Sequence, residues 1–154
     1  GAVVDRDAFL GRGDMPERIA GYCRRTGQAG PDQAGTMIRV ILESLALRYR
    51  QVLELLDSLG GQRVEVIHIM GGGSKNTLLN QFVADATGRT VVAGPTEATA
   101  AGNVLVQAMG AGFITDLEEA RAVVRASFPL ETFTPDRREG WDAAYERYLK
   151  VWGA

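Results

Sequence analysis

Residues 67–81 read IHIMGGGSKNTLLNQ, and this stretch decides the fold more than any other part of the chain. Residues that favour β-structure end in three glycines, and a helical pattern of apolar residues begins after them. A strand that turns directly into a helix leaves backbone N–H groups at the turn, and the helix dipole adds to their attraction for a phosphate. Glycine permits positive φ and close approach of a ligand. The sequence therefore predicts half of a nucleotide site at Gly71, Gly72 and Gly73.

The segments on both sides of this turn predict an α/β arrangement. We expect a strand over 64–70, apolar at nearly every position and therefore covered on both faces. A helix over 76–87 and a second strand over 89–93 follow, and this order predicts a parallel pair of strands. His68, the only histidine, lies within the first strand without partners for a metal site, so we interpret it as a hydrogen-bonded core residue.

Helical periodicity extends over most of the remaining chain. We expect a short helix over 15–25 with one apolar face, and a long helix over 32–59 before the turn. After it we expect a helix over 97–109, whose small residues let its neighbours pack close, and a helix over 116–126 capped by Asp116. We expect the terminal helix to begin at Asp136 and to have Leu149 among its inward residues. Residues 129–135 read as an extended linker between two prolines. The chain as a whole therefore predicts one helix-rich domain around a short sheet.

The long helix carries two rows of apolar residues. The main row contains Met37, Ile41, Leu45, Val52, Leu55, Leu56 and Leu59. The row beside it contains Ile38, Leu42, Tyr49 and Leu53. Together they make an apolar surface wider than one neighbouring element needs, so we expect the isolated chain to form homodimers.

Composition limits the classes of function. The 154 residues are 45% hydrophobic and 23% charged, as in an ordinary globular domain. A net charge of −2 argues against a non-specific partner of nucleic acid. No apolar run reaches the ~20 residues that cross a bilayer, so we expect no membrane partner. Cys23 is the only cysteine, which excludes an internal disulfide and favours a cytoplasmic location.

The glycine turn departs from two common phosphate-binding motifs. The P-loop pattern GxxxxGK[ST] fails because the glycines have the wrong spacing and Asn76 follows Lys75. The dinucleotide pattern GxGxxG fails at its last position, again Asn76, and no acidic residue follows at the end of the next strand. From spacing alone, the turn is either a phosphate site or only a tight corner. Spacing alone also leaves two roles for Asn76, a helix N-cap or a side-chain amide that contacts the edge of a nucleotide base.

Two longer stretches carry a resemblance to a known family. Residues 70–88 read MGGGSKNTLLNQFVADATG, and residues 91–103 read VVAGPTEATAAGN. This pair resembles the C-terminal domain of the FGGY carbohydrate kinases. The stretches ILESLALRY at 41–49, FPL at 128–130 and WDAAYE at 141–146 are similar to the branch that phosphorylates L-rhamnulose. The resemblance extends over essentially the whole chain.

The resemblance implies a fold and a set of site residues. Kinases of this family have two actin-like, ribonuclease H-like domains with a cleft between them, and the second contributes an adenosine motif. Carried onto this sequence, Gly72 approaches the α-phosphate and adenosine with its backbone, and Asn76 meets the adenine. Gly71 and Gly73 shape the turn. We expect residues 1–154 to form one domain, a portion of that second domain.

The resemblance also implies what this chain lacks. The N-terminal domain of these kinases holds the sugar and the catalytic aspartate, and we expect it to be absent here. Asp5, Asp7 and Asp14 have no matching motif, so we assign no catalytic residue and no metal ligand. In the full-length kinase the implied cofactor is ATP or ADP with Mg²⁺, whereas the fragment requires none. Its implied partners are the N-terminal domain, an adenine nucleotide and the sugar bound by that domain.

A second class of function stays open. Actin-like domains associate through exposed faces, so the chain is alternatively an assembly module without a catalytic role. Adenine-nucleotide binding at Gly72 and Asn76 favours the kinase interpretation. Self-association without nucleotide binding favours the assembly module.

Overall fold

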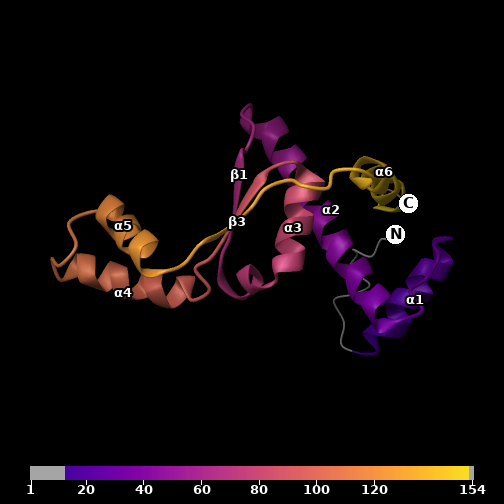
Figure 1. Cartoon of the computed structure of the whole chain (residues 1–154), viewed down its shortest axis with the longest axis horizontal. Coiled ribbons are helices and arrows are strands. Elements are labelled where there is room, and N and C mark those ends of the chain that lie inside the picture. Colours follow the sequence, from indigo (N-terminus) through magenta and orange to yellow (C-terminus); the bar gives the residue numbers. More distant parts are fainter. Residues whose placement is uncertain (1–12, 153–154) are drawn as a thin grey trace.

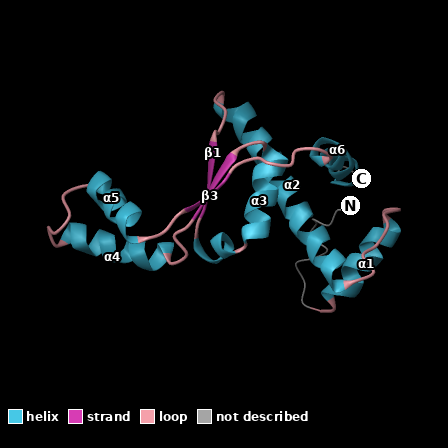
Figure 2. Cartoon of the chain, viewed as in Figure 1, coloured by secondary structure: helices cyan, strands magenta, loops and turns pink. Residues whose placement is uncertain are grey.

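The computed structural model describes residues 13–152, which form a helix-rich chain around one small sheet (Figures 1 and 2). Within these residues the elements follow one another along the chain as α1 (Met15–Arg25), α2 (Ala34–Gly60), β1 (Val66–Ile69), the 3₁₀ turn η2 (Gly71–Lys75), α3 (Thr77–Thr87), β2 (Thr90–Ala93), α4 (Ala98–Gly110), α5 (Leu117–Ser127), β3 (Glu131–Phe133) and α6 (Trp141–Trp152). Asp5 and Asp7 lie outside the described residues. No helix within residues 13–152 is long and apolar enough to cross a membrane.

The sheet is mixed and has the order β1-β2-β3. β1 and β2 run parallel, with Val66 opposite Thr90 and Ile69 opposite Ala93, which confirms the expected parallel pair. β3 runs antiparallel to β2, with Phe133 opposite Val91. The sequence pattern predicted an extended linker over 129–135. This prediction was wrong, because residues 131–133 of the segment pair with β2 and form a third strand.

Side-chain caps begin three of the helices, α1, α3 and α5. Asp14 accepts a hydrogen bond from the N–H of Glu17 at the start of α1. Asp116 accepts one from Glu119 at the start of α5, as the sequence predicted. A capping oxygen satisfies one of the N–H groups that a helix leaves unpaired at its start. These caps fix where each helix begins.

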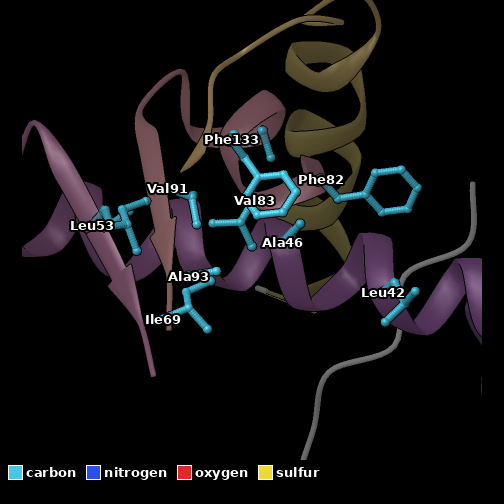
Figure 3. Close-up of a cluster of buried hydrophobic side chains, with 12 residues drawn as sticks. Leu42, Ala46, Leu53, Ile69, Phe82, Val83, Val91, Ala93 and Phe133 are labelled. Carbon is cyan, nitrogen blue, oxygen red and sulfur yellow. The ribbon is translucent and has the colours of Figure 1, made fainter. Parts of the chain in front are cut away.

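The main core lies between the sheet and the two helices that cover one of its faces, α2 and α3 (Figure 3). Val83 and Val91 are completely buried there, on α3 and β2. Further members of this cluster are Leu42, Ala46, Leu53, Ile67, Ile69, Phe82, Ala84, Ala86, Ala93 and Phe133. Their burial fixes α3 against the sheet and so fixes the turn that precedes α3.

The sheet is covered on one face only, which corrects the expectation for β1. Ile67 and Ile69 are buried, whereas Val66 and His68 are exposed. The interpretation of His68 as a core residue was therefore wrong. The apolar run had suggested a strand with both faces covered. Within residues 13–152, no element covers the second face of β1, and its side chains remain open to solvent.

The long helix α2 buries one apolar face and leaves much of its main apolar row exposed. Its buried side chains include Val40, Leu47 and Leu53. The exposed apolar side chains are Ile38, Leu45, Tyr49, Val52, Leu55, Leu56 and Leu59. The main apolar row is therefore largely exposed, because two apolar rows follow the same period and only packing against the sheet selects between them. We name these seven residues the α2 stripe.

Two smaller clusters attach the terminal helices to α2. Ile19 and Cys23 of α1 pack against Val40, which confirms the predicted apolar face of α1. Tyr145 and Tyr148 of α6 are buried in a cluster with Leu47. The terminal helix begins at Trp141 instead of Asp136, and Leu149, predicted to face inward, is exposed. In Figure 1, α1 and α6 lie on the opposite side of α2 from the sheet.

The hairpin of α4 and α5 lies apart from the rest of the chain, at the opposite end from α1 and α6 (Figure 1). Within the described residues α4 has no buried side chain, although its small residues predicted close neighbours. Val104, Val106 and Phe113 are 65%, 67% and 82% exposed. The helix therefore forms without the packing that its sequence anticipates.

An ion pair between α2 and the start of β2 gives a prediction about acid stability. Arg89 is buried and pairs with Asp57, which also accepts the N–H of Val64 at 2.9 Å. The Arg89 hydrogen bond, followed by that from Val64, lowers the pKa of the Asp57 carboxyl. A carboxyl with a lowered folded pKa contributes stability above its unfolded pKa of about 4, and this contribution is lost as the pH falls through the folded value.

We expect Asp57→Asn to lower the free energy of unfolding at pH 7, because Arg89 keeps its charge and loses its partner. The difference from the parent shrinks as the pH falls below about 4 and through the lowered pKa of the folded Asp57 carboxyl. Urea denaturation at pH 7 and pH 3 measures both values. The exposed Asp32→Asn serves as the matched control. A variant whose deficit persists unchanged at pH 3 would contradict the assignment.

Candidate functional site

The glycine turn is a distinct 3₁₀ element between β1 and α3, not a direct passage from strand to helix. Gly71 has φ +75, a conformation that side chains other than glycine rarely adopt. Its N–H donates to the carbonyl of Pro95 at 3.0 Å, and the N–H of Gly94 donates to the carbonyl of Ile69 at 2.8 Å. The end of β1 is thereby tied to the segment that follows β2. This pairing continues the sheet up to the start of the turn.

Gly72 and Gly73 lie exposed within the turn. A Cβ added to Gly72 meets no atom within 4 Å, and one on Gly73 meets Ile69 at an ordinary 3.6 Å. The protein itself leaves room for a side chain at Gly72. The first N–H groups of a 3₁₀ turn have no carbonyl of that turn to bond. The turn therefore presents open backbone at the position where the sequence predicted a nucleotide.

Asn76 occupies the junction between the turn and α3. Its Oδ1 accepts a hydrogen bond from the N–H of Leu79 at 3.0 Å, so the N-cap role is confirmed. The side chain is exposed, and no hydrogen bond joins its Nδ2 to a described residue. The cap uses the side-chain oxygen and leaves the amide donor available. One residue thus serves as a cap and retains a donor for a ligand.

Three polar residues behind the turn were not singled out by the sequence pattern. Ser74 donates its hydroxyl to the carbonyl of Gly71 at 2.7 Å and lies 3.3 Å from the hydroxyl of Thr96. Asn80 donates its side-chain amide to the carbonyl of Ser74 at 3.0 Å. The one signal in the sequence was a polar residue, Asn80, within the apolar run of α3. Together these residues connect the turn to its surroundings.

The other chemically versatile residues of the described chain do not form a second site. Cys23 is buried between α1 and α2, and burial raises the pKa of its thiol, which disfavours the reactive thiolate. Lys75 lies within the turn and Glu97 at the start of α4, and both side chains are exposed. Within residues 13–152, no three His, Cys, Asp or Glu side chains lie close enough together to hold a metal ion. The turn is therefore the best-defined candidate site in the described chain.

The chain is similar in sequence to known carbohydrate kinases. Residues 3–111 match the family model described as FGGY family of carbohydrate kinases, C-terminal domain. The chain is 53% identical over 141 residues to a rhamnulokinase of Bacteroides thetaiotaomicron, covering 92% of this chain and 29% of that protein. It is 44% identical over 127 residues to a rhamnulokinase of Bacillus subtilis, covering 82% and 26%. The chain thus spans less than a third of the length of these relatives.

Solved structures share the fold. The xylulose kinase from Rhodospirillum rubrum superposes with a TM-score of 0.62 at 27% identity, covering 82% of this chain and 26% of that one. The Plasmodium falciparum glycerol kinase, determined with ADP, superposes with a TM-score of 0.56 at 20% identity, covering 77% and 23%. Both are sugar or polyol kinases with the actin-like ATPase fold. By its sequence match and its fold, the chain belongs to the FGGY family of carbohydrate kinases, as part of their C-terminal domain.

Proposed function

We propose that the turn at residues 71–76 binds the adenosine part of ATP and that the chain is the nucleotide half of a sugar kinase. The parent protein then phosphorylates a ketose held by a separate N-terminal domain. L-rhamnulose is the proposed substrate, with L-rhamnulose 1-phosphate as product. The identity of 53% and 44% to two proteins named rhamnulokinase supports this choice.

The observation that carries the proposal is the pairing of Gly72 with Asn76. Gly72 offers exposed backbone with open space above it, and Asn76 offers an amide already oriented by its cap. A nucleotide needs both kinds of contact, close backbone approach at its phosphate or ribose and a donor at its base. The short turn holds these two groups four residues apart in one rigid element.

In our proposal, phosphoryl transfer also requires groups from the rest of the parent protein. A kinase needs a residue that positions the attacking hydroxyl, Mg²⁺ on the nucleotide phosphates, and donors on the transferring group. Within residues 13–152, no three His, Cys, Asp or Glu side chains form a cluster that could hold a metal ion. The proposal assigns the catalytic aspartate to the N-terminal domain of the parent, as the family resemblance implies.

Kinase assays of the parent protein and of the isolated chain test this assignment. We expect the parent kinase to convert L-rhamnulose and ATP to the ketose 1-phosphate and ADP, and the isolated chain to give no turnover. A coupled assay of ADP release measures both. Omission of the ketose is the control for contaminating ATPase. Sugar-dependent turnover that copurifies with the isolated chain would overturn the proposal, as would a parent that leaves the ketose unchanged.

The α2 stripe favours the alternative of an assembly module. Ile38, Leu45, Val52 and Leu59 recur every seven residues and are 57%, 41%, 40% and 77% exposed. Apolar residues at this spacing are typical of the seam between two packed helices. A chain that self-associates and binds no nucleotide would fit an assembly module and not a kinase.

We expect the isolated chain to form concentration-dependent dimers through the α2 stripe. Val52→Glu places a charge in the middle of the stripe and should return the chain to a monomer. Val104→Glu is the matched control, since Val104 is exposed on the separate helix α4. Sedimentation velocity over a range of concentrations measures the result. A chain that stays monomeric at high concentration would exclude this dimer.

A further inference from the structure

A buried side chain of α3 holds the glycine turn from the inside. Asn80 is completely buried, and its Nδ2 donates to the carbonyl of Ser74 at 3.0 Å. Ser74 is 7% exposed, and its hydroxyl donates to the carbonyl of Gly71 at 2.7 Å. Asn80 therefore fixes the fourth residue of the turn, and the hydroxyl of that residue closes the turn onto its first.

A second tie reaches the turn from the segment after β2. The hydroxyls of Ser74 and Thr96 lie 3.3 Å apart, and the carbonyl of Pro95 accepts the N–H of Gly71. This segment is itself fixed, because a Cβ on Gly94 would lie 3.1 Å from the carbonyl of Pro129. The turn is thus held between α3 on one side and a closely packed segment on the other.

Packing alone does not explain an asparagine at position 80. The residue lies in the buried part of α3 beside Phe82 and Val83. Its Oδ1 is buried and has no hydrogen-bond partner among the described residues. An unsatisfied buried acceptor is destabilising, and an apolar side chain of similar size would remove that penalty. What an apolar residue cannot do is hold the carbonyl of Ser74.

We propose that Asn80 is a positioning residue of the nucleotide site. By fixing the carbonyl of Ser74, it sets the path of the chain from Gly72 to Asn76. It thereby sets the separation between the backbone that meets the phosphate or ribose and the amide that meets the base. Thr96 supports the same path through Ser74. This inference rests on the proposed function, because it needs a nucleotide at the turn.

Asn80→Leu in the parent kinase separates positioning from stability. Leucine fills a similar volume and removes the unsatisfied Oδ1, but it also takes the amide donor from the carbonyl of Ser74, so the melting temperature should change little. The loosened turn should weaken ADP binding by about 3- to 10-fold, in line with the loss of one hydrogen bond. The KM for the ketose should not change. Titration calorimetry with ADP, thermal melting and ketose kinetics give the three readouts.

Two further variants make the experiment decisive. Ser44→Ala removes a buried hydroxyl from α2, away from the turn, and should leave ADP affinity unchanged. Thr96→Val keeps the side-chain shape and removes only the hydroxyl, and should weaken ADP binding by about 2- to 3-fold. If circular dichroism shows that Asn80→Leu does not fold, Thr96→Val carries the test.

The outcomes distinguish the two proposals. A wild-type parent that binds no ADP overturns the proposed function and this inference with it. A parent that binds ADP, with Asn80→Leu or, in its place, Thr96→Val binding equally well, overturns the positioning role alone. Weakened ADP binding with an unchanged melting temperature and unchanged ketose KM supports it.

Discussion

Gly72→Val in the parent kinase should weaken ATP binding by about 1–3 kcal/mol, a factor of about 5 to 150, without unfolding the domain. The domain tolerates the side chain because a Cβ at this position meets no protein atom within 4 Å. The proposed nucleotide does not tolerate it, because the valine fills the space into which the ligand would approach the backbone. Isothermal titration calorimetry with ATP and thermal melting measure the two effects separately.

A matched substitution at the neighbouring glycine sharpens this result. Gly71 has φ +75, so Gly71→Val should lower the melting temperature through backbone strain, whatever its effect on the nucleotide. Gly72→Val should leave it unchanged. Equal ATP affinity of Gly72→Val and wild type would remove Gly72 from the site and would favour the tight corner as the sole role of the glycines.

Substitutions at Asn76 should divide its two roles. Asn76→Ala removes the cap, at about 1 kcal/mol of stability, and removes the amide as well. Asn76→Asp keeps a capping oxygen and loses the amide donor, so it should retain stability and lose preference for ATP over GTP. The expected loss of ATP affinity is about 0.5–1.5 kcal/mol for one hydrogen bond. Competition binding with ATP and GTP measures the preference.

Aspartate also adds a negative charge near the nucleotide phosphates, so a neutral variant is needed as a control. Asn76→Ser caps a helix without charge and without an amide. We expect Asn76→Ser to lose ATP preference to the same extent as Asn76→Asp. If both variants discriminate between ATP and GTP as the wild type does, Asn76 is only a cap and the assignment of the adenine contact is wrong.

Local patterns in the sequence predicted the features that depend on neighbouring residues. The cap at Asn76, the parallel pair of β1 and β2, and the apolar face of α1 all follow from spacing within a few turns of chain. The candidate site residues Gly72 and Asn76 came from family resemblance, and their ligand contacts stay predictions. The structure adds that both are exposed at one turn.

Features that depend on distant partners were missed. β3 has three residues between two prolines, and only its pairing with β2 makes it a strand. The choice between the two apolar rows of α2 depends on where the sheet lies. His68 was placed in the core because the apolar run of β1 implied cover on both faces, and within residues 13–152 that cover is not there. The role of Asn80 depends on a carbonyl six residues earlier in the chain, which spacing alone does not single out.

The separate position of α4 and α5 has a consequence for how the chain opens. A helix without a buried side chain can unfold without disrupting the core, so its opening free energy is not tied to global unfolding. α3, whose inner face is completely buried, can exchange its amides only when the core itself opens. The chain therefore contains a region of low local stability at α4 and a region of high local stability at α3. The glycine turn belongs to the more stable region, because it is joined directly to α3.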